Sequence, residues 1–155
     1  MDTTALANLL FPDITKTIED YETIYPPRDL PEGAVVTRIA PSPTGFVHLG
    51  NLYNAIGERL AHQTGGVFYL RIEDTDSSRF VPGAEEYIIE ALRWCGITPD
   101  EGVENGKIVE EPSPRHPYGP YRQSDRKPMY RQYAEQLLRD GWAYYAFDTA
   151  EALDA

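Results

Sequence analysis

The chain has 155 residues, of which 41% are hydrophobic, and it carries a formal net charge of −11 at pH 7. This length and apolar content predict one ordinary globular core, and no apolar run is long enough to span a membrane. Because the amino terminus lacks a basic flank followed by an apolar segment, we expect a cytoplasmic protein without a secretory signal. The single cysteine, Cys95, excludes an internal disulfide, and we expect its thiol to be packed on the apolar side of a helix.

The net charge argues against a nucleic-acid partner, but the charge is unevenly distributed. Residues 1–36 and 99–111 are acidic, whereas basic residues outnumber acidic ones in residues 112–142 and alternate there with tyrosines. Basic and aromatic side chains together suit phosphate neutralisation and base stacking. A solvated helix face with tyrosines packed inward explains the same composition equally well, so both interpretations stay open.

The first half of the chain predicts one strand–helix–strand unit. Residues 1–33 form an acidic extension with a weak helical start and a proline-rich, semi-extended exit. A β-branched strand is expected over residues 34–40, a helix over 49–62 and a second apolar strand over 67–72. Two strands joined by a crossover helix are parallel and right-handed by default. The expected apolar stripe of this helix consists of Leu49, Leu52, Ile56 and Leu60.

Two further helices are predicted in the second half. One opens with Pro82 in its first turn and stops at Gly96, and the other covers residues 127–140. Between them, residues 98–121 are rich in proline and glycine, and a long ordered loop of this kind usually contacts something. Residues 142–147 are typical of a strand. The expected stripes are Ala84, Ile88, Ala91, Leu92 and Cys95 for the first helix, and Tyr130, Tyr133, Ala134, Leu137 and Leu138 for the second.

The turn between the first strand and the first helix has the features of an anion site. Pro41 and Pro43 fix the backbone, and Gly45 admits conformations that other residues avoid. A helix that begins near residue 50 directs its first backbone N–H groups and the positive end of its dipole into this loop, where a phosphate can bind.

Polar side chains surround this turn. Thr44 offers a hydroxyl, His48 a ring N–H for a phosphate oxygen, and Asn51 a further donor, while Gly50 allows a nucleotide to approach the backbone. A lone His-x-Gly at a helix start is more often ordinary capping sequence, so the signal comes from the combination with the preceding loop.

The segment RIAPSPTGFVHLG at residues 38–50 resembles the first signature of glutamyl-tRNA synthetases, which are class I enzymes. Three later segments resemble the same family in the same order: GGVFYLRIEDTD at residues 65–76, GPYRQSDRKPMY at 119–130 and GWAYYAF at 141–147. The resemblance runs from about Val35 to the end of the chain.

The resemblance implies a role for several individual residues. Arg38, Ala40 and Ser42 would line the glutamate site, and Glu73 would hold the α-ammonium of the substrate. ATP would contact Thr44, His48, Gly50 and Asn51, of which His48 and Gly50 are the catalytic pair. The charges of these residues support the assignment, because a guanidinium can bind a carboxylate of the substrate and an acid can bind its ammonium group.

Other polar residues near these motifs receive weaker assignments. Asp76, Arg79 and Arg122 are candidate contacts to the tRNA end, while Asp74 is interpreted as part of an acidic turn or helix start.

The resemblance also implies a fold and an activity. The fold would be α/β, with a Rossmann-like parallel sheet and crossover helices, present in part. Residues 34–98 would begin the ATP- and glutamate-binding catalytic domain, and residues 99–155 would form a loop-rich connection and the start of the inserted region that binds the acceptor end. The parent enzyme would be a glutamate–tRNA ligase that uses L-glutamate, ATP with Mg²⁺ and the tRNA acceptor end, with no membrane partner and a monomer favoured.

Two departures from the family pattern lead to further expectations. Cysteines that begin a zinc site in many members are missing around residues 145–148, so we predict a protein without zinc. The lysine-bearing loop that stabilises the departing pyrophosphate is also missing. We therefore expect an amino-terminal piece of a longer enzyme, which holds ATP weakly at most and does not aminoacylate tRNA at a useful rate.

Three alternatives stay open from the sequence. A shortened paralogue glutamylates queuosine in tRNA, although it normally keeps the zinc cysteines. A small nucleotidyltransferase has a similar helix start but leaves Arg38, Ser42 and Glu73 unexplained. A non-catalytic module that binds tRNA or a protein is the third.

Overall fold

The computed structural model describes residues 2–153, which separate into two compact units. One unit runs from Tyr25 to Lys127, and the other combines the segments Met1–Ile24 and Pro128–Ala155. The boundaries expected at residues 33/34 and 98/99 differ from these, because residues 99–127 pack with the sheet rather than with the end of the chain. The functional labels attached to those ranges stay predictions.

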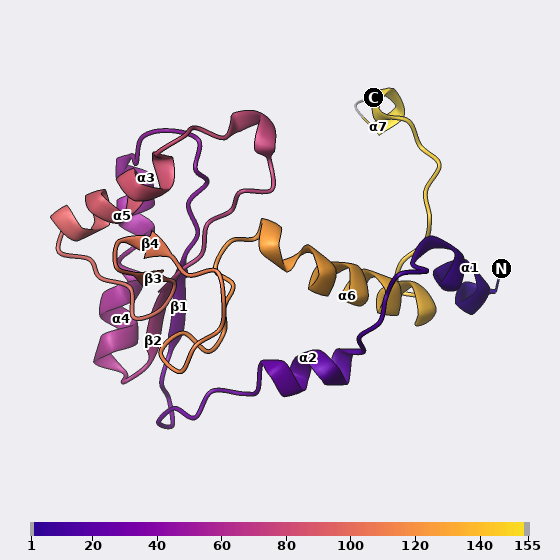
Figure 1. Ribbon diagram of the computed structural model, residues 1–155, viewed down its shortest axis with the longest axis horizontal. Helices are drawn as coiled ribbons and strands as arrows, with labels where there is room; N and C mark the ends of the chain where they lie inside the picture. Colours follow the sequence, from indigo (N-terminus) through magenta and orange to yellow (C-terminus); the bar gives the residue numbers. More distant parts are fainter. Residues whose placement is uncertain (1, 154–155) are drawn as a thin grey trace. The chain divides into compact units, whose positions relative to one another are not determined.

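A parallel strand pair forms the centre of the 25–127 unit (Figure 1). Strands β1 (Val36–Ile39) and β2 (Val67–Leu70) pair in parallel, with Val36 opposite Val67 and Ile39 opposite Leu70. This confirms the predicted α/β arrangement, although both strands are shorter than expected.

The other edge of β2 is also occupied. The backbone N–H of Leu70 donates to the carbonyl of Glu101, and that of Ile72 donates to the carbonyl of Tyr121, both at 3.0 Å. Two isolated parallel bridges form at these places. The segment that was expected to be a loop therefore forms backbone hydrogen bonds with the edge of β2 that does not face β1.

The predicted helix over residues 49–62 is divided into α3 (Leu49–Asn54) and α4 (Gly57–Gln63). Its expected apolar stripe is wrong at three of its four positions, because Leu49, Ile56 and Leu60 are exposed and only Leu52 packs against the core, whereas Ala55 and Ala61 are buried.

The buried face of these two helices consists of the smallest side chains rather than of the most apolar ones. A Cβ on Gly57 would lie 3.1 Å from Cβ of Thr37 in β1, and the Thr37 hydroxyl donates to the Gly57 carbonyl at 2.7 Å. Only small residues allow the helices to approach the sheet this closely.

Helix α5 (Ala84–Trp94) follows the short 3-10 turn η1 (Ser77–Arg79). Its buried residues Ala84, Ile88 and Leu92 confirm most of the predicted stripe. The helix begins after Pro82 rather than at it, because Gly83 stands at its N-cap in a left-handed conformation with φ of 81°. The expectation of a packed Cys95 is wrong, since this residue lies at the C-cap, past the last buried turn, and is exposed.

A small hairpin lies within the proline- and glycine-rich segment. Strands β3 (Val103–Glu104) and β4 (Lys107–Ile108) are antiparallel and are joined by Asn105 and Gly106, both with positive φ. Asn-Gly is a typical two-residue hairpin turn. Its buried Ile108 joins the core, which consists of Ile39, Ala55, Ala61, Phe68, Leu70, Ile72, Ile88, Leu92, Ile108 and Tyr121.

The remaining elements are helical. They are α1 (Thr3–Leu10), α2 (Ile18–Ile24), the 3-10 turn η2 (Ser124–Arg126), α6 (Lys127–Arg139) and α7 (Ala150–Leu153). Helix α6 confirms the prediction for residues 127–140, but its buried residues are Gln132, Glu135 and Leu138, while Tyr133 and Leu137 of the expected stripe are exposed.

The strand expected over residues 142–147 does not form. These residues have no regular secondary structure, and Trp142, Tyr144 and Phe147 are exposed. A strand needs a partner for its backbone groups, and in the described part of the chain nothing pairs with this segment. None of the helices between residues 2 and 153 combines the length and apolar character that crossing a bilayer requires.

Candidate functional site

The two charged residues that the sequence assigned to the amino acid lie together at the carboxyl ends of the parallel strands. Arg38 belongs to β1, and Glu73 follows β2, where its backbone N–H donates to the carbonyl of Pro41 at 3.0 Å. Arg38 Nη1 donates to Glu73 Oε1 at 2.5 Å, and both side chains reach solvent. Ala40 lies half-buried next to them in the chain. The sheet therefore brings a guanidinium and a carboxylate to one edge, where open α/β sheets usually bind ligands.

A third charged residue, which sequence reasoning did not select, completes this cluster. Arg71 Nε and Nη2 both donate to Oε1 of Glu73, at 3.1 and 2.8 Å. Residues two apart in an extended segment point to the same side, so the spacing of Arg71 and Glu73 carried the signal that would have identified the pair.

The turn after β1 is held by its prolines and presents its hydroxyls outward. Pro41 and Pro43 are buried, and the carbonyl of Pro43 accepts from the N–H of Val81 at 3.0 Å. Ser42 and Thr44 are exposed. The predicted polar contacts of the loop are thus available to a ligand.

His48 caps helix α3 with its own side chain. Its Nδ1 accepts from the Gly50 N–H at 3.1 Å, and its backbone N–H donates to Oδ1 of Asn51 at 3.1 Å, which completes a capping box. Because Nδ1 accepts a hydrogen bond, the proton of the neutral ring is on Nε2, and the exposed ring can donate it outward.

This geometry corrects one expectation about the anion site. The first N–H groups of the helix were expected to be free for a phosphate, but the Gly50 N–H is bound to the His48 ring, and α3 has only six residues, so it supplies a short dipole. A Cβ on Gly50 would lie 3.0 Å from Cε1 and Nδ1 of His48, and the contact of Gly50 with ATP stays a prediction. The glycine makes room for the imidazole.

The acidic residues after Glu73 organise the local backbone. Asp74 accepts from the N–H and hydroxyl of Ser124 at 2.9 and 2.5 Å, so it has a structural role as predicted, but it binds the start of η2 rather than its own turn. Asp76 caps η1 and accepts from Ser78 Oγ at 2.5 Å and from Arg79 Nε at 2.6 Å. Hydrogen bonds from Ser78 and then Arg79 hold the pKa of Asp76 below its usual value.

Arg122 is bound by two carboxylates. It donates to Glu85 through Nη2 at 2.8 Å and to Glu110 through Nη1 at 2.7 Å. The hydrogen bonds that Arg122 donates to Glu85 and, with a smaller effect, to Glu110 raise the pKa of its guanidinium. A tRNA contact by Asp76, Arg79 or Arg122 stays a prediction, and a phosphate would have to compete with these carboxylates.

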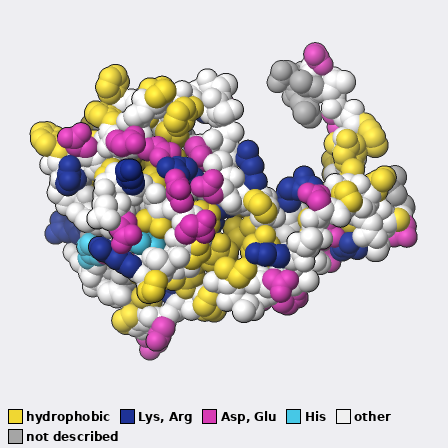
Figure 2. Space-filling model, in the orientation of Figure 1, with side chains coloured by type: hydrophobic (Ala, Val, Ile, Leu, Met, Phe, Trp, Pro, Cys, Tyr) yellow, Lys and Arg dark blue, Asp and Glu magenta, His cyan; other side chains and the backbone are white. Residues whose placement is uncertain are grey.

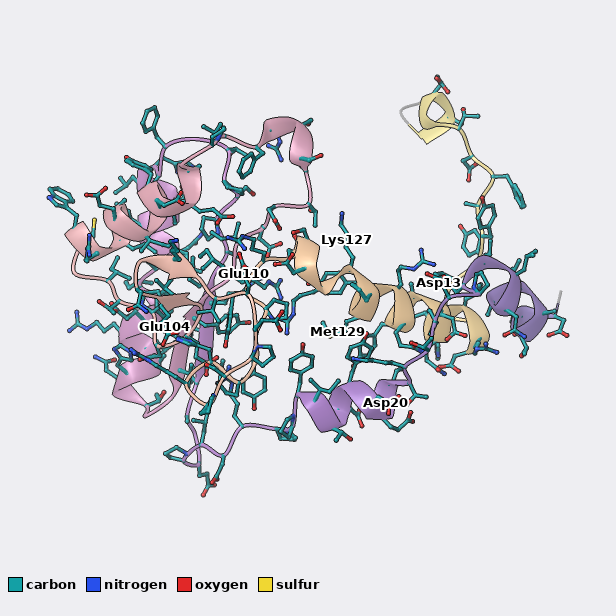
Figure 3. The ribbon with its side chains drawn as sticks, in the orientation of Figure 1. Asp13, Asp20, Glu104, Glu110, Lys127 and Met129 are labelled. Atoms are coloured by element: carbon teal, nitrogen blue, oxygen red, sulfur yellow. The ribbon has the colours of Figure 1, made fainter. Side chains whose placement is uncertain are left out.

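The pair of Arg122 and Glu85 borders an acidic groove of about 700 Å³. Figure 2 shows acidic side chains gathered on the face that carries the β3–β4 hairpin, and Figure 3 labels Glu104 and Glu110, two of the groove residues. Between residues 2 and 153, no group of three or more His, Cys, Asp or Glu side chains is arranged to hold a metal ion.

Comparison with known families identifies the fold. Residues 34–155 match the model of the family described as tRNA synthetases class I (E and Q), catalytic domain. The glutamate–tRNA ligase of Clostridium perfringens (strain 13 / Type A) is 52% identical over 151 residues, which cover 97% of this chain and 27% of that protein. The glutamate–tRNA ligase of Flavobacterium johnsoniae is 59% identical over 122 residues, covering 78% and 23%.

Solved structures agree with the sequence relatives. The crystal structure of a glutamate tRNA ligase from Elizabethkingia meningosepticum, in complex with its amino acid, is 52% identical and has a TM-score of 0.63, with coverage of 77% of this chain and 22% of that one. Glutamate-tRNA synthetase from Elizabethkingia anophelis gives a TM-score of 0.64 at 52% identity, covering 78% and 23%. The chain spans about a quarter of the length of the relatives it matches.

Proposed function

Because the chain belongs to the family of class I tRNA synthetases for glutamate and glutamine, within their catalytic domain, we propose that it supplies part of a site that activates L-glutamate with ATP. The observation that carries this proposal is the cluster of Arg38 and Glu73 at one edge of the parallel sheet, beside the loop that leads to His48. The proposed whole enzyme is a glutamate–tRNA ligase, for which the named relatives provide support.

The charges of the cluster match those of an amino acid. In the absence of a ligand, Arg38 and Glu73 bind each other. A zwitterionic ligand can replace that contact with two new ones, because its carboxylate pairs with the guanidinium and its ammonium pairs with the acid. The hydroxyl of Ser42, which is exposed on the adjacent loop, is the proposed third contact to glutamate, and Ala40 lines the site.

The side chains beyond the loop are suited to a nucleotide. His48 presents Nε2–H as a donor for a phosphate oxygen, and the exposed hydroxyl of Thr44 adds a second donor. Gly50 and Asn51 are further proposed contacts to ATP; Asn51 also accepts from the His48 backbone N–H in the capping box, and Gly50 leaves space for the imidazole. Mg²⁺ is bound chiefly by substrate phosphates in sites of this kind, and there it would offset their charge.

The proposed chemistry requires positioning more than acid–base catalysis. The glutamate α-carboxylate forms a bond to the α-phosphorus of ATP while the bond to the pyrophosphate oxygen breaks, giving glutamyl-adenylate and pyrophosphate. The acyl group then passes to a ribose hydroxyl of the terminal adenosine of tRNA, and AMP leaves. The carboxylate is already a nucleophile, so Arg38 and Glu73 fix the amino acid and His48 stabilises phosphoryl charge.

Binding of ATP to the whole chain tests the nucleotide half of the proposal. Replacing His48 by asparagine removes the Nε2 donor but keeps a good N-cap residue, so the helix start is preserved. We expect ATP affinity to fall about tenfold or more, as for loss of a hydrogen bond to a charged group. His62→Asn is the matched control, because His62 pairs with Asp100 on the surface of α4. Equal ATP affinity in wild type and His48→Asn would remove His48 from the site.

A further inference from the structure

We propose that Arg71 is a positioning residue that holds the carboxylate of Glu73 in place for the ammonium group of the amino acid. This inference rests on the proposed function of the site. Arg71 does not touch the substrate and was not selected from the sequence, and the inference follows from the way that both arginines bind the same oxygen of the carboxylate and leave the other free.

All hydrogen bonds to the Glu73 carboxylate converge on one oxygen. Oε1 receives Nη1 of Arg38 and both Nε and Nη2 of Arg71, whereas in the described part of the chain no hydrogen bond reaches Oε2. A carboxylate oxygen without a partner is an acceptor available to an incoming ammonium group. Oε2 is therefore the atom of Glu73 that receives the ligand.

The two arginines are unequal partners. Arg71 donates two N–H groups from one guanidinium to the same oxygen, which holds the position of Oε1 with two bonds instead of one, and its side chain is 18% exposed. Arg38 donates one, and its side chain is 36% exposed. The backbone of Arg71 is also anchored, because its N–H donates to the carbonyl of Ile39 in β1 at 3.0 Å.

Because the two arginines differ in this way, binding of the amino acid breaks the Arg38–Glu73 contact but leaves the Arg71–Glu73 contact in place. The substrate carboxylate draws Arg38 away from Glu73, which costs Glu73 one hydrogen bond. Arg71 retains its two, so the carboxylate keeps its orientation and Oε2 stays directed to the ammonium. Without Arg71, the same event would leave the Glu73 carboxylate with no hydrogen bond, so the side chain would be free to change rotamer.

The charge of the cluster also fits the ligand. Two guanidinium groups and one carboxylate give a net charge of about +1, and L-glutamate carries about −1 at neutral pH, so the occupied site is close to neutral. Lysine at position 71 would keep this charge but lose the two-pronged grip. The substitution Arg71→Lys therefore separates the positioning effect from the electrostatic one.

The test compares two ligands with the whole chain by NMR titration. Arg71→Lys is expected to weaken L-glutamate binding about fivefold to tenfold, as for one charge-assisted hydrogen bond. Glutarate, which has both carboxylates but no ammonium, should bind with unchanged affinity, because Glu73 has no partner on that ligand. Arg71→Gln should weaken both ligands. Arg93→Lys, an exposed site on α5, is the matched control and should change neither affinity.

A second measurement needs no ligand. Exchange of the Arg71 Nε–H with solvent should be slow in the wild type, fast in Glu73→Gln, and slow again in Arg38→Gln. Fast exchange of this proton in the wild type overturns the inference whatever binds, and so does equal weakening of glutamate and glutarate by Arg71→Lys. If the wild type shows no glutamate binding while the Arg71 Nε–H is slow, the proposed function fails, and the substrate role of Arg71 fails with it.

Discussion

Arg28 neutralises the most buried carboxylate of the 25–127 unit. Its Nη1 and Nη2 donate to the two oxygens of Glu101 at 2.5 and 2.7 Å, and the hydroxyl of Tyr121 donates to Glu101 Oε2 at 2.6 Å. Glu101 is 6% exposed, and the Arg28 guanidinium stacks 3.9 Å from the ring centre of Tyr118. Replacing Arg28 by methionine keeps an apolar stem of similar length but leaves this carboxylate buried without its cation.

The expected loss is about 3 kcal/mol at pH 7, the lower end for breaking a buried ion pair, because Arg28 retains some contact with solvent. The pH dependence has a definite sign. Burial alone would raise the pKa of Glu101, but hydrogen bonds from Arg28 and Tyr121 outweigh it and lower the pKa. The wild type therefore has this stabilisation above the unfolded pKa of about 4.3 and loses it as the pH falls through the folded pKa.

In Arg28→Met the burial effect prevails, so the folded pKa of Glu101 should lie above the unfolded one, and protonation stabilises the fold as the pH falls from neutral. The gap between the two proteins should thus be largest near pH 7 and much smaller near pH 4.

Urea unfolding followed by circular dichroism at the two pH values measures this gap. Arg115→Met, at an exposed site, is the control and should lie within about 0.5 kcal/mol of the wild type. The double variant Arg28→Met/Glu101→Gln should be more stable at pH 7 than Arg28→Met alone, because it no longer buries an unpaired charge. A double variant less stable than the single one, or a gap independent of pH, would refute the reasoning.

Three further outcomes are expected. Gly66→Ala should cost about 3 kcal/mol or more in urea unfolding, because its Cβ would lie 1.9 Å from the Val35 carbonyl oxygen; a loss under about 0.5 kcal/mol would contradict this close approach. Cys95 should react with a thiol reagent in the folded chain at nearly the rate of the unfolded chain, and protection until unfolding would contradict its exposed position. Gly50→Ala should weaken ATP binding about as much as His48→Asn without changing glutamate binding, and unaltered ATP affinity would show that the imidazole does not need the space.

Residue types that are neighbours in the sequence predicted the two central strands and the ends of two helices. The β-branched run before Pro41 and the apolar run before Glu73 gave the parallel pair, and Gly96 and Gly141 marked helix ends. The buried face of residues 49–62 could not be predicted in this way, because apolar periodicity favours large side chains such as Leu49, whereas close approach to the sheet required small ones.

Pairing between distant segments was also beyond local patterns. A β-propensity run such as residues 142–147 forms a strand only where an edge is available. Conversely, the carbonyls of Glu101 and Tyr121 accept hydrogen bonds from β2 and from the segment just after it, although turn residues surround both positions. The Asn-Gly turn at residues 105–106 is a local hairpin signal, and the β3–β4 pair forms around it.

The candidate site followed from the sequence to the extent that charge and chain position determine it. Arg38 and Glu73 were predicted to serve one glutamate site, and they lie together at one edge of the sheet. The ring of His48 binding back to its own helix, and the two-pronged contact from Arg71, depend on rotamers that residue types alone do not specify. The spacing of Arg71 and Glu73 nevertheless indicated a common side.

Binding of a non-hydrolysable glutamyl-adenylate analogue to the whole chain tests most directly whether one site takes both glutamate and ATP. Two-dimensional NMR of the labelled chain should show saturable shifts at Arg38, Glu73 and His48 together, and the corresponding aspartyl analogue, one methylene shorter, should bind more weakly. Equal binding of the two analogues, or shifts confined to residues away from the carboxyl ends of β1 and β2, would contradict the assignment of this sheet edge as the glutamate-activating site.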